Sequence, residues 1–204
     1  MQLIHLASLL LFSTSTLAAP TQPLESRADT TTKTIYPTLQ FRWRSVDGDK
    51  FAPNTATGHL LNMPNEKVHT AIGFEVTDRS IVGKKCKLVF RLSNDDWVVS
   101  PTPSAPAPFD IFRLWGTVND KYSWNYHPER AAPVGTLLAK KGAVAQWQSA
   151  SVPPVTPSIL PPGSSSEWPC ETADYAFELV AHPALNIGWT NGRGSGLAIE
   201  VSDY

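Results

Sequence analysis

The segment Gly83–Leu92, with the sequence GKKCKLVFRL, constrains the fold more than any other part of the chain. It consists of a turn, a cysteine and an alternation that places Leu88, Phe90 and Leu92 on one face. A period of two is typical of a β-strand with one face against a core. Cys86 opens the inward-facing series. We therefore interpret this segment as a central strand of an all-β domain.

The same alternation recurs along most of the chain, and neither a long helical periodicity nor an internal repeat is present. The alternating or strongly apolar runs are Ile35–Arg44, Ile72–Val76, Phe109–Val118, Tyr122–Tyr126, Tyr175–Ala181, Leu185–Trp189 and Leu197–Val201. Two proline-rich stretches, Ser100–Pro108 and Val152–Pro169, cannot be central strands because proline donates no ladder hydrogen bond. The sequence predicts an antiparallel β-sandwich of eight or nine strands with proline-rich loops.

Two connections can be predicted from these runs. Leu185–Trp189 and Leu197–Val201 flank the glycine-rich segment Thr190–Gly196, so we expect them to pair as a hairpin with a longer loop. The proline-rich segment Val152–Pro169 is expected to cross the surface between sheets, and it ends next to Cys170.

Cys86 and Cys170 are the only two cysteines of the chain, which favours a disulfide between them if the protein is secreted. Closing a loop of this length would stabilise the fold by about 4–5 kcal/mol in the chain-entropy model. The alternatives are two free buried thiols or two metal ligands. The absence of a CxxC spacing argues against a metal site.

The N-terminus has the pattern of a secretory signal peptide, which we assign to residues 1–18. Leu6–Phe12 is a short apolar run, and Thr16-Leu17-Ala18 supplies small residues near the cleavage position. An amphipathic or membrane-anchoring N-terminus is the alternative, although this run is too short to span a bilayer. Residues 19–34 are predicted to be a polar spacer or pro-segment, and residues 35–204 the sandwich domain. The expected location is extracellular or in the cell wall.

Composition excludes two classes of partner. A formal charge of -1 provides no basic surface on the scale of a nucleic-acid-binding protein. No later segment is apolar enough to span a membrane. Charged residues make up only 17% of the chain, and 18 prolines suit a loop-rich extracellular protein.

No residue pattern indicates a catalytic, metal or cofactor site. The four histidines beyond the leader are His59, His69, His127 and His182, and none has metal-ligand spacing to another. The paired aspartates Asp47/Asp49 and Asp95/Asp96 lie in turn contexts, and no G-x-S-x-G elbow is present. We therefore expect no enzyme activity and no cofactor, and a secreted hydrolase with a loop-built site is the alternative.

Aromatic residues suggest one ligand-binding hypothesis. Tyr122, Trp124 and Tyr126 alternate, so in a strand their three rings would lie on one face. An exposed strip of this kind can stack on sugar rings, as in a carbohydrate-binding module. The competing interpretation places the strip in the core beneath the second sheet.

Short motifs give the chain a family resemblance. They are Gly83 with Cys86-x-Leu88-x-Phe90, the distant Cys170, and the terminal Gly194-Ser195-Gly196-Leu197. With these motifs, residues 36–204 resemble the C-terminal domain of the fungal But-two (ubiquitin-three-binding protein) family. The resemblance implies a β-rich domain without assigned catalytic residues, so no site residue is carried over.

The partner implied by the family name is a ubiquitin-like activating enzyme, which is cytosolic and would not meet a secreted, disulfide-bonded chain. We therefore expect a secreted structural or interaction protein of the fungal surface or the surrounding medium. Its partner would be a cell-wall polysaccharide or an extracellular protein.

Overall fold

Two antiparallel sheets make up the fold in the computed structural model, which describes residues 31–102, 105–148, 167–191 and 194–204. The four-stranded sheet contains, in spatial order, β1 (Thr31–Ile35), β13 (Gly196–Ser202), β5 (Lys85–Arg91) and β10 (Glu167–Pro169). The nine-stranded sheet contains β6 (Trp97–Val99), β12 (Leu185–Thr190), β3 (Thr57–Met63), β4 (Glu66–Val76), β11 (Ala173–Ala181), β7 (Ala107–Leu114), β8 (Arg130–Ala139) and β9 (Gln146–Gln148), with β2 (Leu39–Arg44) paired to β4.

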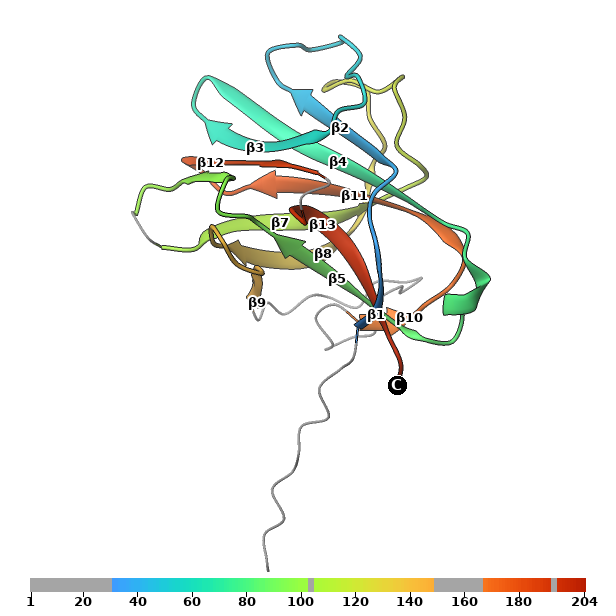
Figure 1. The fold of residues 1–204 in the computed structure, drawn as a ribbon. Coiled ribbons are helices and arrows are strands. Elements are labelled where there is room, and N and C mark those ends of the chain that lie inside the picture. The colour runs from blue at the N-terminus through green and yellow to red at the C-terminus, as the bar shows by residue number, and fades with distance from the viewer. Residues whose placement is uncertain (1–30, 103–104, 149–166, 192–193) are drawn as a thin grey trace, which may run out of the picture.

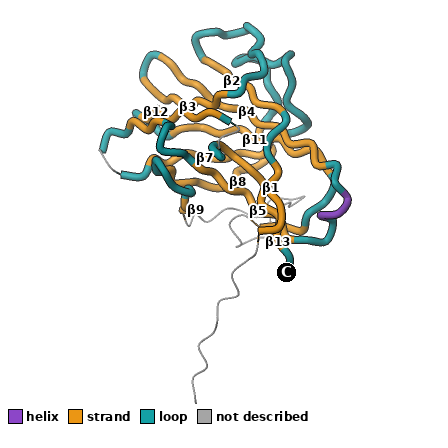
Figure 2. The backbone as a smooth tube through the Cα atoms, in the orientation of Figure 1, coloured by secondary structure: helices purple, strands orange, loops and turns teal. Residues whose placement is uncertain are grey.

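These thirteen strands confirm the predicted all-β class, with more and shorter strands than the eight or nine expected. The only helical element in the described ranges is the single turn η1 (Arg79–Ile81), drawn in purple in Figure 2. No helix in this part of the chain is both long and apolar enough to cross a membrane.

Strand β4 organises the large sheet. Its start, Glu66–Val68, pairs with β3, and its continuation from Thr70 to Val76 pairs with β11, while β2 pairs along the other edge. Because β3 and β11 pair with successive stretches of the same edge of β4, the sheet divides there and curls into a half-barrel. Strands β1, β5 and β13 run steeply across the more nearly horizontal β3, β7, β11 and β12 (Figure 1).

The main core lies between the two sheets, where the inward series of each strand meets the other sheet. The opening segment supplies Leu88 and Phe90 from β5, which are fully buried. The Phe90 ring makes edge contacts with Phe109 of β7 and Trp189 of β12, at centroid distances of 4.8 and 5.1 Å. The alternation in Gly83–Leu92 therefore correctly predicted a central, core-lining strand.

A second, smaller hydrophobic cluster lies on the outer face of the large sheet. On β4, Ile72 and Phe74 belong to the main core, whereas Ala71 belongs to this outer cluster, as the period of two requires. The outer cluster consists of Phe41, Trp43, Ala52, Ala71, Leu114, Val118 and Ala176, with Leu39, Tyr122 and Trp124 packed against it. The outer face is thus not a simple polar surface.

The predicted disulfide is present. It links Cys86 of β5 to Cys170, the residue that directly follows β10. Cys86 and Cys170 are bonded with a Cα–Cα distance of 5.0 Å, and both are buried. Cys86 pairs in register with Trp168 of β10, while the Cys170 N–H donates to the Lys84 carbonyl at 2.8 Å. The bridge therefore fixes β10 and the chain that follows it to the edge of β5.

The predicted C-terminal hairpin is wrong. Strand β12 pairs with β3 and β6 in the large sheet, whereas β13 pairs with β1 and β5 in the small one. Both strands direct their apolar series, including Ile187 of β12 and Ile199 of β13, into the same main core. They therefore face each other across the sandwich.

Parts of three predicted segments lie outside the described residues. The signal peptide, residues 1–18, lies there entirely, as do residues 19–30 of the spacer and residues 152–166 of the proline-rich crossing. The last residues of the predicted spacer, from Thr31, belong to β1, which pairs with β13. The folded part that the structure describes therefore begins ahead of residue 35.

Gly58 on β3 is required by the ring that lies against it. A Cβ at this position would lie 1.9 Å from ring atoms of Trp189, which is fully buried. We expect Gly58→Ala to lower the free energy of unfolding by about 1–3 kcal/mol through overpacking, measured by urea denaturation. Gly188→Ala is the matched control, because its Cβ overlaps equally with Trp97, whose exposed ring can turn into solvent. Equal losses in both variants would contradict this explanation.

Candidate functional site

The connection between β7 and β8 carries Tyr122, Trp124 and Tyr126, and it is a loop, not the predicted strand. The backbone N–H of Ser123 donates to the Tyr126 carbonyl at 2.8 Å, and the Tyr126 N–H donates to the Ser123 hydroxyl at 3.2 Å. This turn prevents an extended alternation, because residues 123 and 126 are held face to face. The predicted strand is therefore wrong, although the rings of Tyr122 and Tyr126 still lie 6.2 Å apart, centroid to centroid.

The three rings also differ in exposure. Tyr122 and Trp124 are half-buried against the outer cluster, whereas Tyr126 is 71% exposed. The Trp124 ring lies 4.6 Å, centroid to centroid, from His69 of β4. Tyr122 and Trp124 thus pack against the outer face of the large sheet and not in the main core between the sheets. Ligand binding at this loop stays a prediction, now centred on Tyr126.

Next to Trp124, three elements meet at a buried ion cluster around Glu178 of β11. Glu178 is fully buried. Its carboxylate accepts a hydrogen bond from His69 Nδ1 at 2.6 Å and bonds from Arg130 Nε and Nη2 at 2.6 and 3.1 Å. The Arg130 guanidinium also lies 4.2 Å over the Phe112 ring. The cluster ties β4, β8 and β11 together.

The electrostatics of this cluster favour a permanently charged carboxylate. Burial alone raises the pKa of Glu178, but the hydrogen bonds and charges of His69 and Arg130 outweigh it and lower the pKa to about 2. The same hydrogen bond to Glu178 raises the pKa of Arg130. A general acid needs the opposite shift, because it must hold its proton near neutral pH. Glu178 is therefore suited to structural pairing and not to proton transfer.

A second polar cluster lies further along the same face. Asp110 of β7 accepts hydrogen bonds from the Thr136 hydroxyl at 2.6 Å and from His182 Nε2 at 3.1 Å. His182 is half-exposed. Within the described residues, no group of three or more His, Cys, Asp or Glu side chains could hold a metal ion.

A third group of side chains was not singled out from the sequence. Trp97 of β6, Asn186 of β12 and His59 of β3 lie side by side in the sheet and are linked by hydrogen bonds. Glycines within strands were the available signal, because they often mark the close approach of another group. Gly188 of β12 accommodates the Trp97 ring in this way.

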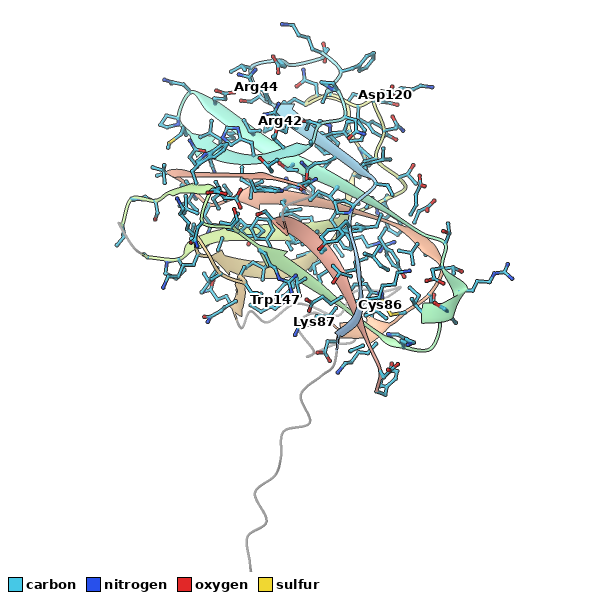
Figure 3. All side chains as sticks on the ribbon, viewed as in Figure 1. Arg42, Arg44, Cys86, Lys87, Asp120 and Trp147 are labelled. Carbon is cyan, nitrogen blue, oxygen red and sulfur yellow. A yellow bond between two sulfur atoms is a disulfide. The ribbon has the colours of Figure 1, made fainter. Side chains whose placement is uncertain are left out.

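One hollow of about 230 Å³ adjoins the segment that follows β2. Arg42 and Arg44, which contribute to it, lie at the end of the molecule opposite Cys86 (Figure 3). Arg44 is neutralised by Glu66 at 2.8 Å and lies 3.6 Å from Asp47. The lining residues are Arg42, Arg44, Asp47, Lys50, Phe51, Ala52 and Pro53. The hollow is lined by both positive and negative side chains, some of which pair with each other. Its charge therefore does not indicate a substrate class.

Comparison with known proteins agrees with the fold. A family model described as the "Ubiquitin 3 binding protein But2 C-terminal domain" matches residues 36–161. No curated protein matches the chain. The match starts at the same residue as the resemblance drawn from the sequence and ends at 161 instead of 204, but it still covers more than half of the chain. The chain therefore belongs to the But2 C-terminal domain family.

Proposed function

We propose that this protein is secreted and works outside the cell as a non-catalytic interaction protein whose ligand is a cell-wall polysaccharide. The Cys86–Cys170 bridge supports the location, because disulfides persist in oxidising compartments. The predicted leader at residues 1–18 agrees with it. For the same reason we do not extend to this chain the ubiquitin-related binding in the family's name.

The observation that carries the non-catalytic role is the pairing of Glu178 with His69 and Arg130 on the outer face. A glycoside hydrolase needs two available carboxyl groups, one of which holds a proton at working pH. Glu178 has a lowered pKa and no solvent exposure. Asp110, the nearest carboxylate along the strands, is occupied by Thr136 and His182. These groups support a scaffold more than an acid–base pair.

Exposed aromatic rings support a polysaccharide ligand. Tyr126, Trp115 and Trp97 are 71%, 57% and 46% exposed. Such rings bury apolar area against the C–H face of a sugar while their polar ends stay hydrated. Several separate rings also suit a polymer, because each can contact a different unit.

The test uses the oxidised, secreted protein with insoluble β-glucan, chitin and cellulose. We expect retention on at least one polymer, eluted by its soluble oligosaccharide, with no release of reducing sugar. Glu178→Gln should, like the wild type, release no reducing sugar. Release of sugar that Glu178→Gln abolishes would establish a hydrolase instead. If the protein binds none of the three polymers, a polysaccharide is excluded as its ligand. An extracellular protein then remains as the partner class.

A further inference from the structure

Trp97 lays its indole on the backbone of the neighbouring strand, at the surface of the large sheet. The residue pairs with Gly188 of β12, and a Cβ built on Gly188 would lie 1.9 Å from the Trp97 ring. One face of the ring therefore rests on glycine backbone. The side chain is nevertheless 46% exposed, so part of the ring stays open to solvent.

Hydrogen bonds fix the orientation of the neighbouring polar groups. Trp97 Nε1 donates to Asn186 Oδ1 at 3.1 Å, and His59 Nε2 lies 2.9 Å from the same oxygen. An indole nitrogen can only donate, so the amide oxygen must face it. Burial is the main cause that lowers the pKa of His59, and the charges of Arg42 and Arg44 act in the same direction. The imidazole is therefore neutral, with its proton on Nε2.

This arrangement leaves one acceptor and one donor group unused beside the ring. In the neutral tautomer, His59 Nδ1 is an acceptor, and Asn186 Nδ2 carries two donor hydrogens. Neither atom has a hydrogen-bond partner among the residues that the structure describes. Both side chains are held by their other atoms, so they are oriented before any ligand arrives.

Resting on the polysaccharide-binding role above, we propose that Trp97, Asn186 and His59 form a subsite for one pyranose ring of a neutral glycan. The apolar C–H face of the sugar lies on the indole. One hydroxyl donates to His59 Nδ1 and its neighbour accepts from Asn186 Nδ2. The site thus recognises two adjacent hydroxyl groups of the sugar ring.

The chemistry of the site favours this ligand over others. A lipid chain would cover the indole but leave a donor and an acceptor unpaired, which is unfavourable. A ligand that presents only an ionised carboxylate or phosphate has no proton to donate to His59 Nδ1, so the acceptor disfavours it. A neutral pyranose satisfies all three groups, because each hydroxyl both donates and accepts.

The test follows the indole N–H signals of the oxidised protein by NMR during titration with laminarihexaose, cellohexaose or chitohexaose. We expect a saturable shift of the Trp97 signal with at least one of them. Trp97→Ala should weaken binding about tenfold or more, and Trp97→Phe should weaken it less because the apolar ring remains. Tyr36→Ala is the matched control, since Tyr36 is also an exposed aromatic residue, at 52%, but lies outside this group, and it should bind like the wild type.

The outcomes separate the subsite from the proposed function. If none of the three sugars shifts the Trp97 signal, or if Trp97→Ala binds as well as the wild type, the subsite is overturned. Polymer retention that survives Trp97→Ala would keep the proposed function and remove only the subsite. Binding of a soluble sugar at Trp97 without retention on any polymer would keep the subsite and remove the proposed function. The wild-type titration decides the question even if a variant does not fold.

Discussion

Replacing both bridge cysteines, Cys86→Ala with Cys170→Ala, is expected to lower the free energy of unfolding by about 4–5 kcal/mol. The bridge closes a loop with a sequence separation of 84, so its removal restores a large conformational entropy to the unfolded chain. A typical domain has only about 5–15 kcal/mol of stability in total. The loss should therefore appear as a large shift of the midpoint in guanidinium unfolding at 25 °C.

Reduction of the wild type provides the control for this experiment. A reducing agent should lower wild-type stability by a similar amount and leave the double variant unchanged. Local opening should appear first at β10, because it pairs with β5 over only three residues next to the bridge. Hydrogen exchange can locate this opening. A loss below about 1 kcal/mol would show that the segment before Cys170 is already held by other contacts.

Glu178→Gln is the second change with a large expected effect. It removes the buried carboxylate that both His69 and Arg130 contact. Removing one partner of a buried ion pair typically costs about 3–5 kcal/mol. We expect a loss near the low end, about 3 kcal/mol, because Arg130 is partly exposed and can be hydrated. Urea unfolding at neutral pH measures it.

The pH dependence of the free energy of unfolding tests the same ion cluster. The pKa of Glu178 is lowered from its ordinary value of 4.5 to about 2. Its contribution to stability is thus complete above pH 4.5 and is lost as the pH falls toward 2. Glu178→Gln should flatten the stability curve in this window. Glu75→Gln, an exposed carboxylate on neighbouring β4, is the matched control and should change little. An unchanged curve for Glu178→Gln would refute the assigned ion cluster.

The all-β class and the main core were predictable because strand alternation is a local property. The Gly83–Leu92 pattern placed Leu88 and Phe90 in the core, and both are fully buried. The disulfide was also predictable, since a chain with two cysteines and a predicted secretory leader has one possible intramolecular pairing. The pairing of strands was harder, because Leu185–Trp189 and Leu197–Val201 alternate in the same way whether they lie in one sheet or face each other.

The candidate sites could not be predicted for a related reason. Glu178, His69 and Arg130 are far apart in sequence, and each alone resembles an ordinary polar position on a strand or loop. The run Tyr122–Tyr126 alternates like a strand, but a turn at Ser123 and apolar area on the outer face draw it into a loop. Local alternation cannot tell whether a polar face will be covered by such a loop.

The sequence by itself thus determined the class of fold, the central strand with Cys86 and the single bridge, because these follow from side-chain period and cysteine count. Only the tertiary structure decided which strands share a sheet, that Glu178 is buried, and that Trp97 meets Asn186 and His59. The physical reason is that these contacts join residues from distant segments, and their free energy depends on packing across the sheets. An amino-acid pattern records the period of each strand but not the partner that each face will meet.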